Sequence, residues 1–152
     1  MEIEDLFHLE TKIVKNRVVF KFIYTEKPIT ELRMLKTIGT MKTVLESFQK
    51  KEIGHVSFVF IINKIIMPSN MGLIKDFAAT FHSYADIINQ KLDFTIIQSN
   101  STIFKLFFSF FKMYYEPIKP LYLSENDEST EKCLESKDER GKVTNFSDML
   151  KN

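Results

Sequence analysis

The sequence at residues 55–62 reads HVSFVFII, a nearly unbroken apolar run of strand length. Such a run is typical of a strand in the middle of a sheet, because a strand with one face in water alternates apolar and polar residues. We therefore expect this segment to be the central strand of a sheet whose two faces are covered by helices.

Two strands and a helix are expected on the N-terminal side of this run. Residues 9–15 and 17–25 are rich in β-branched and aromatic side chains and are separated by the turn former Asn16, which predicts a β-hairpin. Thr30 is a suitable cap for the helix that follows. Its apolar residues recur at spacings of three and four, and it is expected to end near Gly54.

On the C-terminal side, the pattern predicts helices at 72–90, 102–115 and 128–136 and strands at 94–98 and 121–123. The whole order is then β-β-α-β-α-β-α-β-α. Strands that alternate with crossover helices predict an α/β fold with a single, mainly parallel or mixed sheet of about five strands. We expect one domain over residues 1–136 and a mobile C-terminal tail over residues 137–152.

The composition limits which classes of partner and which cellular compartment we expect. The chain has 152 residues, 44% of them hydrophobic, which suits one globular core. A formal net charge of +1 gives no general attraction for nucleic acid, which is bound through uncompensated Lys and Arg. No segment has the length and apolarity of an export signal or a membrane span. We expect a cytoplasmic protein, free or peripheral to a membrane, that binds no nucleic acid.

No set of residues forms a catalytic or metal-binding pattern. The histidines His8, His55 and His82 lack the partners and the spacing of a metal motif, and the four glycines form no phosphate-binding loop. We therefore assign no catalytic, cofactor-binding or metal-binding residue, and we expect a protein that is not an enzyme.

Two titratable residues have structural interpretations. Asp93 lies at the end of an element, where a solvated carboxylate is the default. The single cysteine, Cys133, allows no intramolecular disulfide, which fits a reducing compartment. Its neighbours Glu131 and Glu135 would raise the pKa of the thiol, so we expect Cys133 to be a packing residue.

The element order and two segments carry a family resemblance. The segments are MPSNMGL at residues 67–73 and YEPIKPLYLSENDESTEKCL at residues 115–134. Over about residues 9–136 the chain resembles the STAS domain of bacterial anti-sigma-factor antagonists, and it is similar to the related core of CRAL-TRIO lipid-transfer domains. The first resemblance implies regulation through protein contacts, and the second implies an apolar groove for lipid.

The first of these segments corresponds to the regulatory loop of the STAS family. In regulatory members, Asp, a phosphorylatable Ser or Thr and one more small hydroxyl residue precede a Gly at the start of a helix. Matching Gly72 to that Gly places Ser69, Asn70 and Met71 in the preceding positions. The Asp is absent, and Asn70 and Met71 carry no hydroxyl, so a kinase-controlled switch is not expected and Ser69 is interpreted as a helix cap.

The expected helix at residues 102–115 has more apolar surface than one sheet face can cover. Its sequence is TIFKLFFSFFKMYY, and its polar residues Lys105, Ser109 and Lys112 fall within an arc of about 60°. Burial by neighbouring segments, a protein interface or contact with lipid would each account for the excess. The hypothesis of an interaction surface names these side chains: Phe104, Phe107, Phe108, Phe111 and Tyr115.

The preferred functional interpretation is a non-enzymatic regulatory or scaffold module of STAS-like fold. It would bind a protein partner, or a second copy of itself, through this helix or through the loop with Ser69, Asn70 and Gly72. The alternative is a small lipid-binding or lipid-transfer domain of CRAL-TRIO type.

Overall fold

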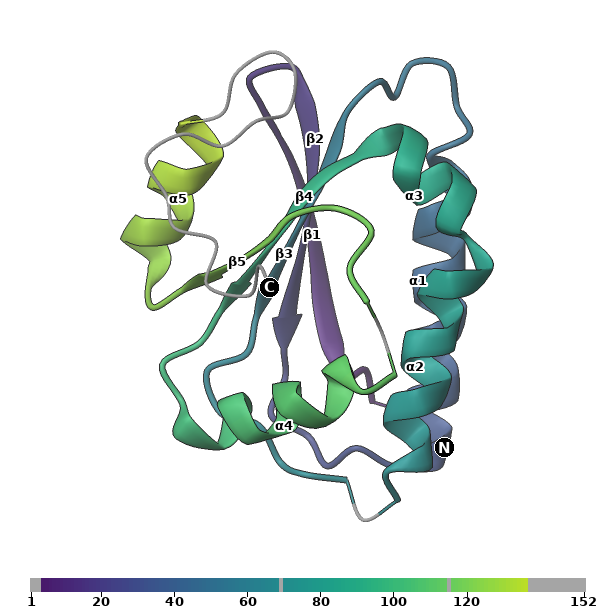
Figure 1. Cartoon of the computed structure of the whole chain (residues 1–152), viewed down its shortest axis with the longest axis vertical. Helices are drawn as coiled ribbons and strands as arrows, with labels where there is room; N and C mark the ends of the chain where they lie inside the picture. Colours follow the sequence, from purple (N-terminus) through teal and green to yellow (C-terminus); the bar gives the residue numbers. More distant parts are fainter. Residues whose placement is uncertain (1–3, 69, 115, 137–152) are drawn as a thin grey trace.

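A computed structural model describes residues 4–68, 70–114 and 116–136, without the side chain of Phe110. The expected tail at residues 137–152 lies outside the described residues. The elements, labelled in Figure 1, are β1 (Phe7–Val14), β2 (Arg17–Tyr24), α1 (Glu31–Ser47), β3 (Val56–Ile61), α2 (Gly72–Ser83), α3 (Ala85–Lys91), β4 (Leu92–Gln98), α4 (Thr102–Lys112), β5 (Leu121–Ser124) and α5 (Asp127–Glu135).

The strands form one five-stranded sheet in the order β1-β2-β3-β4-β5. β1 runs antiparallel to β2, and the remaining neighbours are parallel. This confirms an α/β fold with a single, mainly parallel mixed sheet. β3 is the central strand, and all six of its residues are buried, as its apolar run predicted.

The predicted hairpin is present, with a two-residue turn. Lys15 and Asn16 have φ values of 50° and 63°, and Val14 pairs with Arg17 across the turn. Positive φ at both central residues is the geometry of a turn whose twist matches that of the flanking strands. Lys15 therefore belongs to the turn rather than to the first strand.

The first two predicted helices differ most from those in the structure, and the third ends at Lys112 rather than at residue 115. The helix expected at 72–90 is divided at Tyr84, whose φ of −113° and ψ of 24° leave the helical region, so the order contains one helix more than predicted. The Tyr84 hydroxyl donates to Glu46 of α1 at 2.7 Å, a tertiary contact that periodicity does not reveal. α1 ends at Ser47 rather than near Gly54, and residues 48–52 form turns.

Helices cover both faces of the sheet, but unequally. Figure 1 shows α1, α2 and α3 on one side of the strands and α5 on the other, and α4 packs with the first group. The larger core lies between this group and the sheet and contains Phe22, Phe58 and Phe60. The smaller core, under α5, consists of Val19, Val59, Ile61, Phe94, Ile96, Tyr122, Cys133 and Leu134.

Candidate functional site

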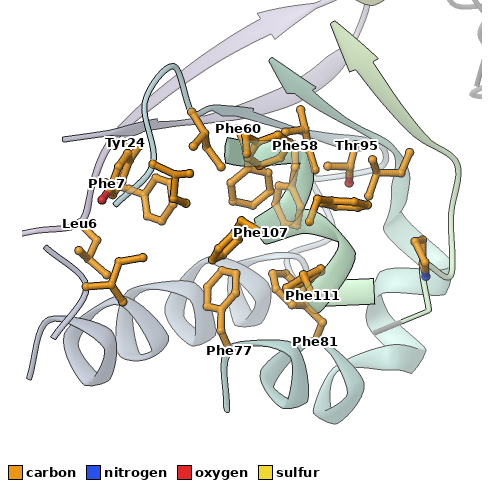
Figure 2. Close-up of a pocket in the computed structure, with 18 of the residues that line it drawn as sticks. Leu6, Phe7, Tyr24, Phe58, Phe60, Phe77, Phe81, Thr95, Phe107 and Phe111 are labelled. Carbon is orange, nitrogen blue, oxygen red and sulfur yellow. The ribbon is translucent and has the colours of Figure 1, made fainter. Parts of the chain in front are cut away.

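The larger core contains a partly open apolar cavity of about 100 Å³. Figure 2 shows it between the sheet on one side and the aromatic side chains of α2 and α4 on the other. The lining residues are Leu6, Phe7, Tyr24, Ile29, Met34, Phe58, Phe60, Ile62, Ile65, Phe77, Phe81, Leu92, Thr95, Ile97, Phe104, Phe107, Phe108, Phe111, Pro117, Lys119 and Leu121. Phenylalanine is the commonest residue type among them, with nine of the 21 residues.

One stripe of α4 forms the wall opposite the sheet. Phe104, Phe107, Phe108 and Phe111 recur at spacings of three and four, which places them on one face of the helix. Their rings contact one another, with centroids 5.9 Å apart for Phe104 and Phe108 and for Phe108 and Phe111. Phe111 also lies 6.2 Å from Phe77 of α2, so the two helices share one aromatic layer.

The sheet supplies the other wall, because alternate strand residues point to the same face. Phe60 of β3 stacks on Phe22 of β2 with ring centroids 4.8 Å apart, and its centroid lies 6.0 Å from those of Phe58 and Phe7. Aromatic rings therefore contribute to both walls of the cavity.

Only three of the described lining residues carry polar side-chain atoms. The hydroxyl of Tyr24 donates to the Lys27 carbonyl at 2.6 Å, and burial raises the pKa of this phenol. The Thr95 hydroxyl has no hydrogen-bond partner among the described residues, and Lys119 has no ion-pair partner among them.

The structure places the predicted interaction residues inside rather than outside. Phe104 and Phe108 are 2% and 6% exposed, Phe107 and Phe111 are partly buried, and all four line the cavity. Tyr115 lies outside the described residues. The outward face carries other apolar side chains of this segment, namely Ile103, Leu106 and Met113, which are 52%, 57% and 72% exposed.

The predicted regulatory loop leads directly into α2. Ser69 lies outside the described residues. The N-cap of α2 is Met71, and the preceding Asn70 accepts a hydrogen bond through its Oδ1 from the Gly72 amide at 2.9 Å. A Cβ at Gly72 would lie only 3.0 Å from that oxygen, so this position favours glycine. These features give the loop a structural role at the start of α2.

A buried ion pair on the opposite face was missed by the sequence interpretation. Asp93 is not a solvated carboxylate, since its side chain is only 11% exposed; it accepts from Arg17 Nε at 3.1 Å and lies 3.1 Å from His55 Nδ1. Arg17 is buried and lies over the ring of Phe94, 5.2 Å from its centroid. A register shift between β3 and β4 at Val56 and Ser57 creates this arrangement, and local sequence carries no signal of it.

Cys133 lies on the same side of the sheet, where it is a packing residue of the smaller core. Burial raises the pKa of its thiol to about 12, while the charge of Arg17 acts in the opposite direction. The predicted direction is confirmed, but its predicted cause, Glu131 and Glu135, is not the one in the structure. A thiol with this pKa is protonated at neutral pH and is a poor nucleophile.

Within the described ranges, no three His, Cys, Asp or Glu residues are grouped so as to hold a metal ion, and no helix has the length and apolarity needed to cross a membrane. Comparison with family models, curated proteins and solved structures finds no match for this chain. The apolar cavity is consequently the feature from which function is inferred.

Proposed function

We propose that this protein is a non-enzymatic binding domain that takes a small apolar molecule, or the end of an apolar chain, into the cavity beneath α4. The observation that carries the proposal is an aromatic-lined space of about 100 Å³ in the larger core. A cavity of about 150 Å³ with Leu, Ile and Phe walls stays dry and binds benzene or xenon. A space of this kind is therefore a suitable site for apolar ligands.

The energetics favour occupation. An empty cavity deprives its lining atoms of dispersion partners; at ~24 cal/mol per Å³ a closed space of about 100 Å³ costs roughly 2 kcal/mol, and a partly open one costs less. A ligand that fills the space recovers those contacts without opening new surface to water. Removal of this cost when the ligand binds contributes part of the binding free energy.

The cavity shifts the preference between the two interpretations drawn from the sequence. Phe104, Phe107, Phe108 and Phe111 line a cavity beneath α4, which supports a reduced lipid-binding domain of CRAL-TRIO type over a STAS-like module that docks a protein on these side chains. The volume suits one ring or a short acyl segment rather than a whole two-chain lipid. Either family membership remains a proposal, supported by the single mixed sheet with helices on both faces.

The decisive experiment compares ligand binding before and after the cavity is filled. Benzene and 1-octanol are titrated into the full chain, and binding is followed by the methyl resonances of Ile65, Ile97 and Leu121. Ile97→Phe adds a ring inside the cavity and should abolish binding, whereas Leu106→Phe adds a ring on the outward face of α4 and should leave binding unchanged.

The result that would overturn the proposal is equally concrete. Failure of the wild-type chain to bind both compounds would refute it, as would unchanged binding in a folded Ile97→Phe variant. If that variant does not fold, Leu121→Phe fills the same cavity from β5. Native mass spectrometry of the purified protein would reveal any ligand that it retains.

A second candidate function is association with a protein partner or a second copy. The outward side chains of Ile103, Leu106 and Met113 favour it, because they form an exposed apolar row beside Lys105 and Ser109. Light scattering of the wild type and of Leu106→Glu tests this function. A wild type that is strictly monomeric at high concentration contradicts self-association, and failure to float with liposomes contradicts docking of this row on a membrane.

A further inference from the structure

Lys119 is the one charged side chain among the described residues that line the cavity. It lies in the connection between α4 and β5 and is partly exposed. No acidic side chain of the described residues pairs with it. A lysine without an acidic partner among the described residues therefore lines a space that is otherwise almost wholly apolar.

The backbone holds Lys119 close to Thr95. The Thr95 amide donates to the carbonyl of Pro120 at 3.0 Å, and Leu121 is the register partner of Thr95 in the neighbouring strand. Both Thr95 and Lys119 line the cavity. The Thr95 hydroxyl, which has no partner among the described residues, is thus a second donor among the residues that line the cavity.

The polarity of the cavity is concentrated at this end. Tyr24, on β2, is separated from β4 by the whole width of β3, and Figure 2 shows Tyr24 and Thr95 at opposite ends of the cavity. The Tyr24 hydroxyl already donates a hydrogen bond to the Lys27 carbonyl. A ligand would therefore meet free donors at the end near β5 and an aromatic surface along the rest of its length.

We infer that the natural ligand is an amphipathic monocarboxylate, with its carboxylate at Lys119 and Thr95 and its apolar body among the phenylalanines of α4. This inference rests on the proposed function, because it names the class of ligand for the same cavity. A carboxylate accepts from both donors and supplies the missing negative charge. A single lysine matches one negative charge better than the nearly two charges of a phosphomonoester.

The test compares octanoate with 1-octanol, which share a chain length but differ in charge. Calorimetric titration of the full chain at low salt should show octanoate binding about three- to tenfold more tightly, a modest ratio because Lys119 is partly exposed. This preference should disappear in Lys119→Met and weaken in Thr95→Val. It should persist in Lys105→Met, which removes an exposed charge of α4 that does not line the cavity.

The outcomes separate the two proposals. Equal binding of octanoate and 1-octanol to the wild type refutes the carboxylate site but leaves the apolar cavity function standing. If neither compound binds, both the carboxylate site and the apolar cavity function are refuted. Loss of the preference in Lys105→Met to the same extent as in Lys119→Met would also overturn the inference, because the effect would then be one of general charge.

Two measurements on the wild type keep the inference falsifiable if Lys119→Met fails to fold. Octylamine should bind more weakly than 1-octanol, because its ammonium would face that of Lys119. High salt should reduce the affinity for octanoate and leave that for 1-octanol nearly unchanged. Octylamine binding as tight as octanoate binding, or a salt-independent preference, would refute the carboxylate site.

Discussion

The orientation of α4 determines the cavity, and one pair of adjacent substitutions tests it. Phe104 is 2% exposed and Ile103 is 52% exposed, although both are large apolar residues in the first turn of the same helix. Phe104→Ala removes a ring from the cavity wall. Ile103→Ala removes a side chain that is half in water, so it serves as the matched control.

The expected magnitudes follow from burial. Full burial of a large apolar side chain contributes about 2–3 kcal/mol, and the space left by Phe104 adds a cavity term, so Phe104→Ala should cost about 4 kcal/mol. Ile103 retains only about half of its burial, and alanine has the higher helix propensity, so its replacement should cost less than about 1 kcal/mol. For a domain of this size, about 4 kcal/mol lowers Tm by roughly 8–16 °C.

Urea unfolding followed by circular dichroism measures both free energies of unfolding. The enlarged cavity also predicts a rescue: at one fixed benzene concentration, Phe104→Ala should gain more stability than the wild type, by about 2.7 kcal/mol where that concentration is 100 times the Kd of the variant, and Ile103→Ala should gain no more than the wild type. Equal destabilisation by the two substitutions, or a greater loss for Ile103→Ala, would refute the described orientation of α4 and with it the cavity.

The face under α5 yields three further predictions. Because the pKa of Cys133 is raised from 9.0 to about 12, its alkylation at pH 8 should be roughly a thousandfold slower in the native protein than in urea. Since the pKa of the thiol is higher in the folded protein, its protonated form stabilises the fold fully below pH 9, and this stabilisation is lost as pH rises toward 12. An alkylation rate in the native protein close to that in urea would contradict the raised pKa. Arg17→Met should lower the free energy of unfolding by about 3 kcal/mol, because it leaves the buried Asp93 carboxylate without its guanidinium. A loss below about 1 kcal/mol would contradict the dependence of this carboxylate on Arg17. In contrast, Lys12→Met should cost less than about 1 kcal/mol in the same urea assay, since Lys12 and Glu131 are 37% and 44% exposed, and a larger loss would show that this pair is stronger than an ordinary surface pair.

The fold class could be predicted from the sequence because its signals are local. The apolar run of β3 requires cover on both faces, and the structure buries all six residues of this strand. The hairpin follows from two β-rich segments with Asn16 between them, and the structure pairs Val14 with Arg17 across that turn. Such patterns depend on residues near one another in the chain and survive without knowledge of distant contacts.

The break between α2 and α3 could not be predicted in the same way. The apolar stripe continues through Tyr84, so periodicity alone extends the helix to residue 90. In the structure, the hydroxyl of Tyr84 bonds to Glu46, which is distant in sequence, and the backbone leaves the helical region there. Likewise, the carboxylate of Asp93 is recognisable as buried only after β2, β3 and β4 are aligned in register.

The sequence by itself determined the α/β class, the central position of β3 and the excess of apolar surface on α4, because composition and periodicity encode which residues avoid water. Only the tertiary structure decided which of those α4 side chains face inward, and it separated the buried Phe104 and Phe108 from the exposed Ile103 and Leu106. It also decided that Lys119 and Thr95, which are distant in sequence, line the same cavity. A helix with apolar residues on nearly every side has no intrinsic inner face, and the sheet and α2 against which it packs select one.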